Sequence, residues 1–104
     1  IQKIKNWIKI SLMKNQFVDN NIPVILGEFD ATRRTTLTGD DLTLHLASRA
    51  YFLKYVVKQA KANGMLPFYW DNGGIGNLSS GIFNRNDNTV FDTQALEALL
   101  EGLN

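Results

Sequence analysis

Two short apolar runs in the sequence each lead into a side chain that could act on a substrate. Residues 23–27 (PVILG) are followed by Glu28, and residues 66–69 (LPFY) are followed by Trp70. A carboxylate is costly to bury unless it is paired, so Glu28 is expected at a strand end, as a nucleophile or an acid–base group. Trp70 offers an apolar ring plane and one N–H donor, which suits the C–H face of a pyranose. Structural interpretations stay open: a capping or salt-bridged Glu28, and a Trp70 that packs in the core.

The pattern around these residues predicts the order helix, strand, helix, strand, helix. Apolar residues at helical spacing, separated by turn-forming residues, predict helices near 1–19, 41–63 and 92–103. The two apolar runs predict parallel strands near 23–29 and 66–71, buried on both faces. Each strand is expected to begin at its proline, where the missing N–H does least harm. The expected apolar helix faces are Ile4, Trp7, Ile8, Leu12 and Phe17; Leu46, Ala50, Leu53, Val57 and Ala60; and Leu96, Leu99, Leu100 and Leu103.

Side-chain alternation predicts which residues share a face with the two candidate site residues. In a regular strand Val24 and Leu26 point the same way as Glu28, and Leu66 and Phe68 point the same way as Trp70. The segment at 71–88 is rich in Gly, Asn and Ser and is expected to be a loop.

The composition is that of a globular domain and excludes several classes of function. Hydrophobic residues make up 44% and charged residues 20% of the chain, and the net charge of +1 gives no electrostatic case for a nucleic-acid or membrane partner. With no cysteine, disulfides and thiol nucleophiles are ruled out. No apolar run reaches the roughly 18–20 residues of a membrane span. We expect neither a metal site nor a cofactor, and no catalytic role for the single histidine, His45.

Both runs, with the residues that follow them, resemble glycoside hydrolase family 5, the endoglucanase family. Residues 22–29 (IPVILGEF) followed by 31–33 (ATR) are similar to its seventh-strand motif, and 69–73 (YWDNG) to its eighth-strand motif, as found in the subfamily of endoglucanases, licheninases and xyloglucanases. The stretch 81–85 (GIFNR) and the helix from Asp92 also match. The resemblance covers essentially the whole chain. It implies an α/β fold, the C-terminal portion of a TIM (β/α)8 barrel with about strands 7–8 and helices 6–8.

The same resemblance implies a retaining hydrolysis of β-1,4-linked glucans by double displacement. Glu28 matches the nucleophile, Trp70 matches the platform under the sugar at the cleavage point, and Asp71 and Asn72 are candidates for contacts with sugar hydroxyls. In such enzymes a second carboxyl group, about 5–5.5 Å from the first, serves as the acid/base. In the family this Glu lies upstream of the matched region, so the chain alone is expected to be nearly inactive. Secretion is also implied by the family.

Residue 30 departs from the family pattern, which usually has glycine there. Asp30 adds a second carboxylate near Glu28 and is expected to blunt the nucleophile. A barrel needs about 250 residues, so residues 1–104 are expected to be the C-terminal fragment of one catalytic domain. Besides the glucan, the expected partner is the remainder of the barrel or a second copy. Two alternatives stay open: a non-catalytic, self-associating fragment, and an unrelated α/β binding module.

Overall fold

Over the described residues, 2–104, the computed structural model contains three α-helices and two small sheets. Side chains are described from Lys5 onward; Ile1 and the Ile4 side chain, both part of the predicted first helix, lie outside the described residues. The helices are α1 (Gln2–Gln16), α2 (Gly39–Ala62) and α3 (Thr93–Gly102), with a 3-10 helix, η1 (Val18–Asn20), after α1. The strands are β1 (Ile25–Phe29), β2 (Leu66–Tyr69), β3 (Phe83–Asn84) and β4 (Thr89–Val90).

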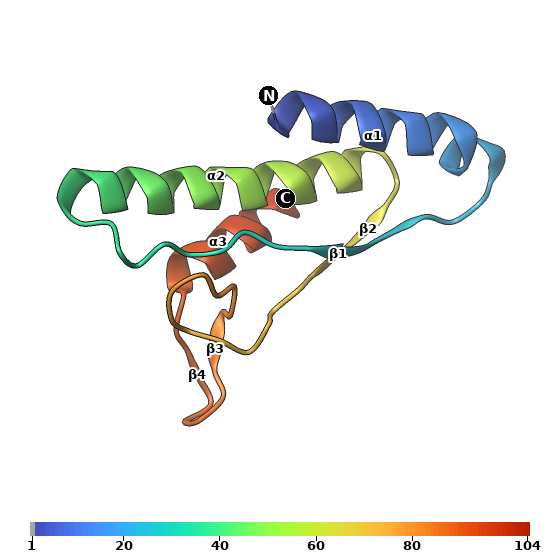
Figure 1. Cartoon of the computed structure of the whole chain (residues 1–104). Helices are drawn as coiled ribbons and strands as arrows, with labels where there is room; N and C mark the ends of the chain where they lie inside the picture. Colours follow the sequence, from blue (N-terminus) through green and yellow to red (C-terminus); the bar gives the residue numbers. More distant parts are fainter. Residues whose placement is uncertain (1) are drawn as a thin grey trace.

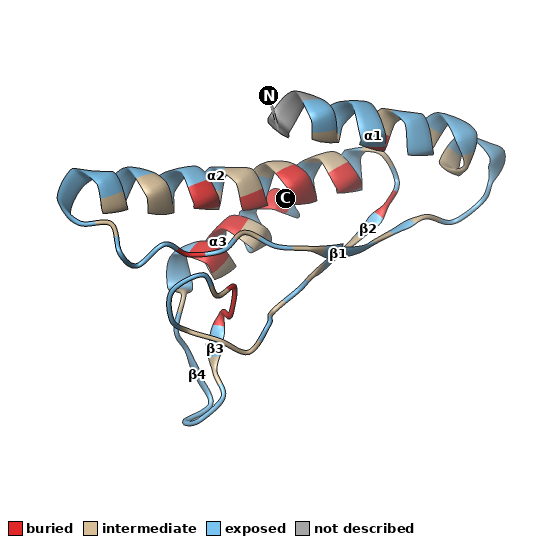
Figure 2. Cartoon of the chain, viewed as in Figure 1, coloured by how far each residue is buried: buried red, intermediate tan, exposed pale blue. Residues whose placement is uncertain are grey.

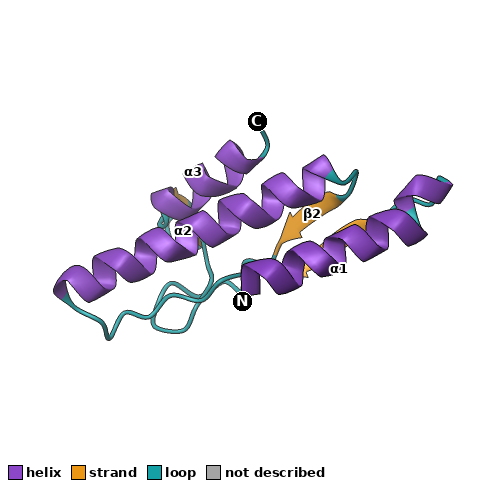
Figure 3. Ribbon diagram, turned by 90° about the horizontal axis from the view of Figure 1, so that it is seen from above, coloured by secondary structure: helices purple, strands orange, loops and turns teal. Residues whose placement is uncertain are grey.

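The strands β1 and β2 pair in parallel, with α2 as the connection between them, as the sequence predicts. The three helices lie in one layer over one face of this pair (Figures 1 and 3). The opposite face carries exposed apolar side chains and is covered by no element of the described chain. The arrangement is that of α/β units with helices on a single side of the sheet.

The ends of the helices are set by residues that tolerate unusual backbone angles. The chain turns at Asn21 with φ 62° after η1, and at Gly64 with φ 74° after α2, as expected from their residue types. At the start of α3 the Asp92 carboxylate accepts a hydrogen bond from the Ala95 N–H at 3.0 Å, an N-cap of the ordinary kind.

The core lies between α2 and its neighbours, on the faces drawn in red in Figure 2. One cluster joins Leu53 of α2 to Ala95 and Ala98 of α3 and to Ile82. The other joins Ile10 of α1 to Ala60 of α2 and to Met65. Because α2 contributes to both clusters, it holds the two strands and the other two helices together.

Two of the predicted helix faces need correction. On α1 the expected residues Trp7, Ile8 and Leu12 are exposed, and Ile10 makes the core contact. The reason is that no described element covers the other sides of α1. On α3 the predicted Leu96 and Leu99 pack against the core, but Leu100 and Leu103 are exposed. Ala95, Ala98 and Gly102 are buried instead, because this helix approaches the α2 backbone closely.

The strand predictions are corrected in two details. Neither proline begins its strand: Pro23 lies two residues before β1, and Pro67 is the second residue of β2. The segment at 71–88 is not entirely loop, since β3 at Phe83–Asn84 pairs with β4 at Thr89–Val90 in an antiparallel hairpin that projects away from the helices (Figure 1). Strands of two residues carry too little periodicity to be recognised in the sequence.

Candidate functional site

The predicted site residues lie at the same end of the parallel sheet. Ile25 pairs with Leu66 at the start of the strands and Phe29 pairs with Tyr69 at their ends. One residue further, the Trp70 N–H donates to the Phe29 carbonyl oxygen at 2.8 Å. Glu28 and Trp70 are therefore placed beside each other along the carboxyl edge of the sheet, on neighbouring strands.

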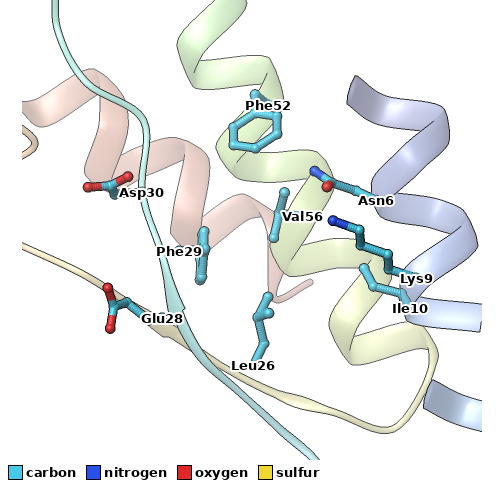
Figure 4. A pocket seen from close by; sticks show the side chains of 9 residues that line it. All are labelled: Asn6, Lys9, Ile10, Leu26, Glu28, Phe29, Asp30, Phe52 and Val56. Carbon is cyan, nitrogen blue, oxygen red and sulfur yellow. The ribbon is translucent and has the colours of Figure 1, made fainter. Parts of the chain in front are cut away.

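An irregularity in β1 decides which way Glu28 points. The pairing register shifts between Leu26 and Phe29, and both of these side chains pack toward the helices. Glu28 is exposed and, in Figure 4, is directed to the side of β1 away from α1 and α2, whereas Leu26 points toward these helices. The prediction that Val24 and Leu26 share the face of Glu28 is therefore wrong, since the shift interrupts the alternation.

The carboxylate of Glu28 is open to solvent. Among the described residues, no hydrogen bond or ion pair reaches it, and Asp30 projects from the same side of the strand (Figure 4). A cleft of about 300 Å³ lies against this strand end, with Lys9 and Asn6 of α1 on its far wall and Phe52 of α2 above it. The Glu28 carboxylate points away from this cleft, into solvent on the side of β1 that no described element covers, and this gives it the access that a nucleophile needs.

Trp70 presents its ring to the uncovered face of the sheet. Its side chain is 51% exposed and shares that face with Leu66 and Phe68, as alternation along β2 predicts. Pro67 and Tyr69 face the helices and are partly buried. The Trp70 indole is thus available for contact in the part of the chain that the structure describes.

The Asp71 carboxylate is occupied by the loop that follows β2. It accepts the N–H of Gly73 at 2.7 Å and of Ile82 at 2.9 Å, and Arg85 lies 3.3 Å away. Burial raises the pKa of Asp71, but these backbone N–H groups and the Arg85 charge outweigh it, so that the pKa lies below its usual value. Its acceptor positions are largely used in folding the loop.

The two ends of the Asn72 amide have different surroundings: the oxygen bonds to the loop and the nitrogen is open to solvent. The Oδ1 atom accepts from Gly74 N at 2.9 Å and from Ser80 N at 3.1 Å. The residue is exposed, and its Nδ2 atom makes no hydrogen bond with the described residues. Only the Nδ2 donor remains for a sugar hydroxyl.

A buried ionic cluster beneath the site was not recognised in the sequence. Asp92 binds Arg33 at 3.1 Å and Arg49 at 2.5 Å, and each of these three side chains is at least nine-tenths buried. Burial raises the pKa of Asp92, but the Ala95 N–H and the two arginines lower it more, and the pKa is below its usual value. Arg33 also stacks over the Phe91 ring at 5.1 Å. One feature of the sequence could have indicated this cluster: Arg49 stands among the expected apolar residues of α2.

The remaining polar groups offer no second centre. His45 accepts the Arg34 N–H at 3.0 Å and so serves the loop before α2. Across residues 2–104, no three acidic, histidine or cysteine side chains gather as a metal site would require. No helix in this same range combines the length and apolar character needed to cross a membrane.

Comparison with known proteins finds relatives of one kind. A xyloglucan-specific endo-β-1,4-glucanase of Bacteroides ovatus is 39% identical over 90 residues, which is 86% of this chain and 17% of that protein. Endoglucanase A of Paenibacillus barcinonensis is 32% identical over 88% of this chain and 22% of its own length. No model of a protein family matches the chain.

Solved structures give the same result. A family 5 xyloglucanase from Paenibacillus pabuli superposes with a TM-score of 0.90 at 30% identity, over 98% of this chain and 27% of that one. The Bacteroides ovatus family 5 xyloglucanase, in complex with a XXXG heptasaccharide, superposes with a TM-score of 0.86 at 35% identity. The superposition covers 97% of this chain and 21% of that one. The two strands and three helices are thus part of a (β/α)8 barrel, and the chain spans about a quarter of the length of these structures. By sequence and by fold, the chain is similar over nearly its whole length to enzymes of glycoside hydrolase family 5.

Proposed function

We propose that this chain supplies the nucleophile and the sugar platform of a retaining endo-β-1,4-glucanase. The observation that carries the proposal is the placement of two groups at adjacent ends of two parallel strands: the Glu28 carboxylate, which has no partner among the described residues, and the exposed Trp70 indole. Active sites of (β/α)8 barrels lie at this end of the strands. The relatives support a β-1,4-glucan as the substrate class, since they are named as endoglucanases and xyloglucanases.

The chemistry proceeds in two displacements. The Glu28 carboxylate attacks the anomeric carbon while the bond to the leaving sugar oxygen breaks, and a carboxylic acid outside this chain protonates that oxygen. Water then attacks the glycosyl ester, the same group accepts the water proton, and Glu28 is released as a carboxylate. Because two carboxyl groups are required, the 104-residue chain is nearly inactive alone and acts when it forms part of a complete barrel. Secretion follows from this proposed role.

The nucleophile is tested by substitution in a complete barrel that carries this segment. Glu28→Gln keeps the shape of the side chain but cannot form the glycosyl ester, so hydrolysis of a β-1,4-glucan should fall by several powers of ten, each worth about 1.4 kcal/mol. Asp30→Asn is the matched control, because it removes the neighbouring carboxylate on the same side of β1 and should retain turnover. Near-normal turnover of Glu28→Gln would refute the assignment.

Chemical rescue provides a second and independent measurement. Glu28→Gly leaves room for azide to attack an activated glycoside from the face that Glu28 occupied. The product is then a glycosyl azide of inverted configuration, which is detected by NMR. A rescued product of retained configuration contradicts the role of Glu28.

Self-association is a second candidate role, favoured by the uncovered face of the sheet. Ile25, Leu66, Phe68 and Trp70 form an exposed, mostly apolar surface on this face. The radius of gyration is 14.9 Å, against about 13 Å for a compact domain of 100 residues. A chain of this shape gains by burying the open face against a second copy.

A further inference from the structure

The backbone of Trp70 is fixed from two directions. On one side its N–H donates to the Phe29 carbonyl oxygen of the neighbouring strand, at 2.8 Å. On the other side its carbonyl oxygen accepts the Ser80 hydroxyl at 3.1 Å. The first contact belongs to the sheet, whereas the second comes from a loop residue ten positions later. The angle at which the indole leaves the strand therefore depends on Ser80 as well as on β1.

Ser80 is completely buried and uses all its polar groups on residues that flank Trp70. Its N–H donates to Asn72 Oδ1 at 3.1 Å, and its hydroxyl oxygen accepts the Asn72 N–H at 3.4 Å. Its carbonyl oxygen accepts the Tyr69 hydroxyl at 2.6 Å. Ser80 thus holds Tyr69 through its backbone carbonyl oxygen, Trp70 through its hydroxyl, and Asn72 through both its hydroxyl and its backbone N–H.

These hydrogen bonds of Ser80 to Tyr69, Trp70 and Asn72, here called the Ser80 clamp, are connected to the core through Tyr69. The Tyr69 hydroxyl accepts from Arg49 Nη2 at 3.3 Å, and Arg49 is held by Asp92 at 2.5 Å and by the Ala31 carbonyl oxygen at 2.6 Å. Burial raises the pKa of Tyr69, partly opposed by Arg49, so the hydroxyl keeps its proton and remains a donor to Ser80. The orientation of the loop therefore depends on the positions of α2, which carries Arg49, and of α3, which Asp92 caps.

The packing around Ser80 leaves no room for adjustment. A Cβ atom at Gly81 would lie 2.2 Å from the Gly74 carbonyl oxygen, and one at Gly74 would lie 2.4 Å from Ser79 Oγ. Two backbone segments thus meet at van der Waals distance beside the clamp. A hydrogen bond in such a rigid setting restricts the partner more than one on a mobile loop does.

We propose that Ser80 is a positioning residue, which sets the orientation of the Trp70 indole relative to Glu28. The inference rests on the proposed function of Trp70 as the sugar platform. The hydroxyl itself contacts no sugar, because it is buried beneath the loop. It acts by holding the Trp70 carbonyl, so that the ring is already oriented when the glucan arrives and less entropy is lost on binding.

The test uses Ser80→Ala in the 104-residue chain with Trp7→Phe, which leaves Trp70 as the single tryptophan. Time-resolved fluorescence anisotropy then reports the motion of Trp70. We expect the order parameter of the indole to be lower in this variant than in the Trp7→Phe chain that keeps Ser80, while the far-UV circular dichroism is unchanged. Ser79→Ala is the matched control: the same atoms are removed one residue away, where the hydroxyl makes no hydrogen bond with the described residues, and the order parameter should stay high.

A second variant covers the case in which Ser80→Ala does not fold. Ser80→Cys is nearly isosteric but its S–H is a weaker donor, so the Trp70 order parameter should fall in the same direction by a smaller amount. An order parameter equal to that of Ser79→Ala in every folded variant overturns the proposal. The sugar-platform role itself is tested by cellotetraose binding, followed by tryptophan quenching in the Trp7→Phe chain and in the complete barrel. Absence of quenching in both contradicts the proposed function and leaves the anisotropy result on Ser80 valid.

Discussion

The carboxylates of this chain differ sharply in their surroundings, and the difference separates reactive from structural groups. Glu28 is exposed and unpaired among the described residues, whereas Asp71 and Asp92 accept several hydrogen bonds each. A carboxylate whose lone pairs are all engaged is a poor nucleophile, but it is an effective organiser of backbone N–H groups. At the residue scale, this contrast supports the proposed role of Glu28, whereas the two aspartates hold the loop after β2 and the start of α3.

The first prediction concerns Asp92 and pH. Its pKa is lowered in the folded chain, so its contribution to stability is present above the usual pKa of about 3.8 and is lost as the pH falls below about 4. Asp92→Asn preserves an N-cap but leaves Arg33 and Arg49 as buried charges without a carboxylate, at a cost of about 3–5 kcal/mol at neutral pH. Urea unfolding as a function of pH checks this. The difference in the free energy of unfolding between parent and variant should become smaller below about pH 4. A difference that does not change with pH contradicts the assigned pairing.

The second prediction separates two roles of Asn72. Asn72→Asp keeps an oxygen that can accept from Gly74 and Ser80 but removes the free Nδ2 donor, whereas Asn72→Ala removes both. The melting temperature should therefore fall for Asn72→Ala more than for Asn72→Asp. If Nδ2 donates to a sugar hydroxyl, both variants should weaken glucan binding in a complete barrel, by about 1–3 kcal/mol for a lost contact. Unchanged binding by Asn72→Asp removes Asn72 from the set of substrate contacts.

At the scale of the elements, the packing of α3 on α2 requires one glycine. A Cβ atom at Gly102 would lie 2.8 Å from the Lys54 carbonyl oxygen and 2.8 Å from Val57 Cβ. Both atoms belong to the rigid middle of α2 and cannot move aside cheaply. The closeness of the two helices is therefore set by the absence of a side chain at this position.

The third prediction follows from this contact. Gly102→Ala should destabilise the chain, because overpacking costs about 1–3 kcal/mol while the gain in helix propensity is at most about 1 kcal/mol. Gly76→Ala is the control, since a Cβ atom there meets nothing within 4 Å and should change stability by less than about 0.5 kcal/mol. Chemical denaturation of both variants gives the comparison. Equal denaturation midpoints for Gly102→Ala and Gly76→Ala would show that α2 and α3 can move apart without loss of stability.

The elements themselves were largely predictable from the sequence, because each helix and each long strand has a periodic pattern and a local stop signal. Asn21, Gly64 and Asp92 act within a few residues, and their effects can be recognised without knowing the fold. The direction of Leu26 could not be predicted, since the register shift in β1 arises from pairing with β2. The buried pair of Arg33 and Arg49 was also missed, because burial of an arginine depends on a carboxylate far away in the chain.

At the scale of the whole molecule, the most prominent feature is the face of the sheet that no described element covers. The described chain measures 45 × 30 × 22 Å, and its apolar residues on the open face have no partner element. Exposed strand edges and apolar faces of this kind promote association. A complete barrel would place the same face toward its interior.

The fourth prediction tests association with a matched pair of variants. Leu66 is 64% exposed on the open face and Leu44 is 65% exposed on α2, so Leu66→Lys and Leu44→Lys add the same charge at equal exposure. Light scattering over a range of concentrations should show a larger average mass for the parent chain and for Leu44→Lys than for Leu66→Lys. A parent chain that remains a compact monomer at every concentration excludes the self-associating role.

The cluster of Arg33, Arg49 and Asp92 also has an evolutionary consequence. The three residues come from the loop before α2, from α2 and from the start of α3, and one carboxylate serves both cations. Loss of Asp92 leaves two buried cations without a carboxylate, whereas loss of either arginine leaves Asp92 paired with the other. The effect of substituting Asp92 therefore depends on whether the arginines have already been replaced. Such dependence is epistasis. Lineages descending from this sequence are expected to keep Asp92 wherever both arginines are kept, and a survey of orthologous sequences would show this as correlated substitution.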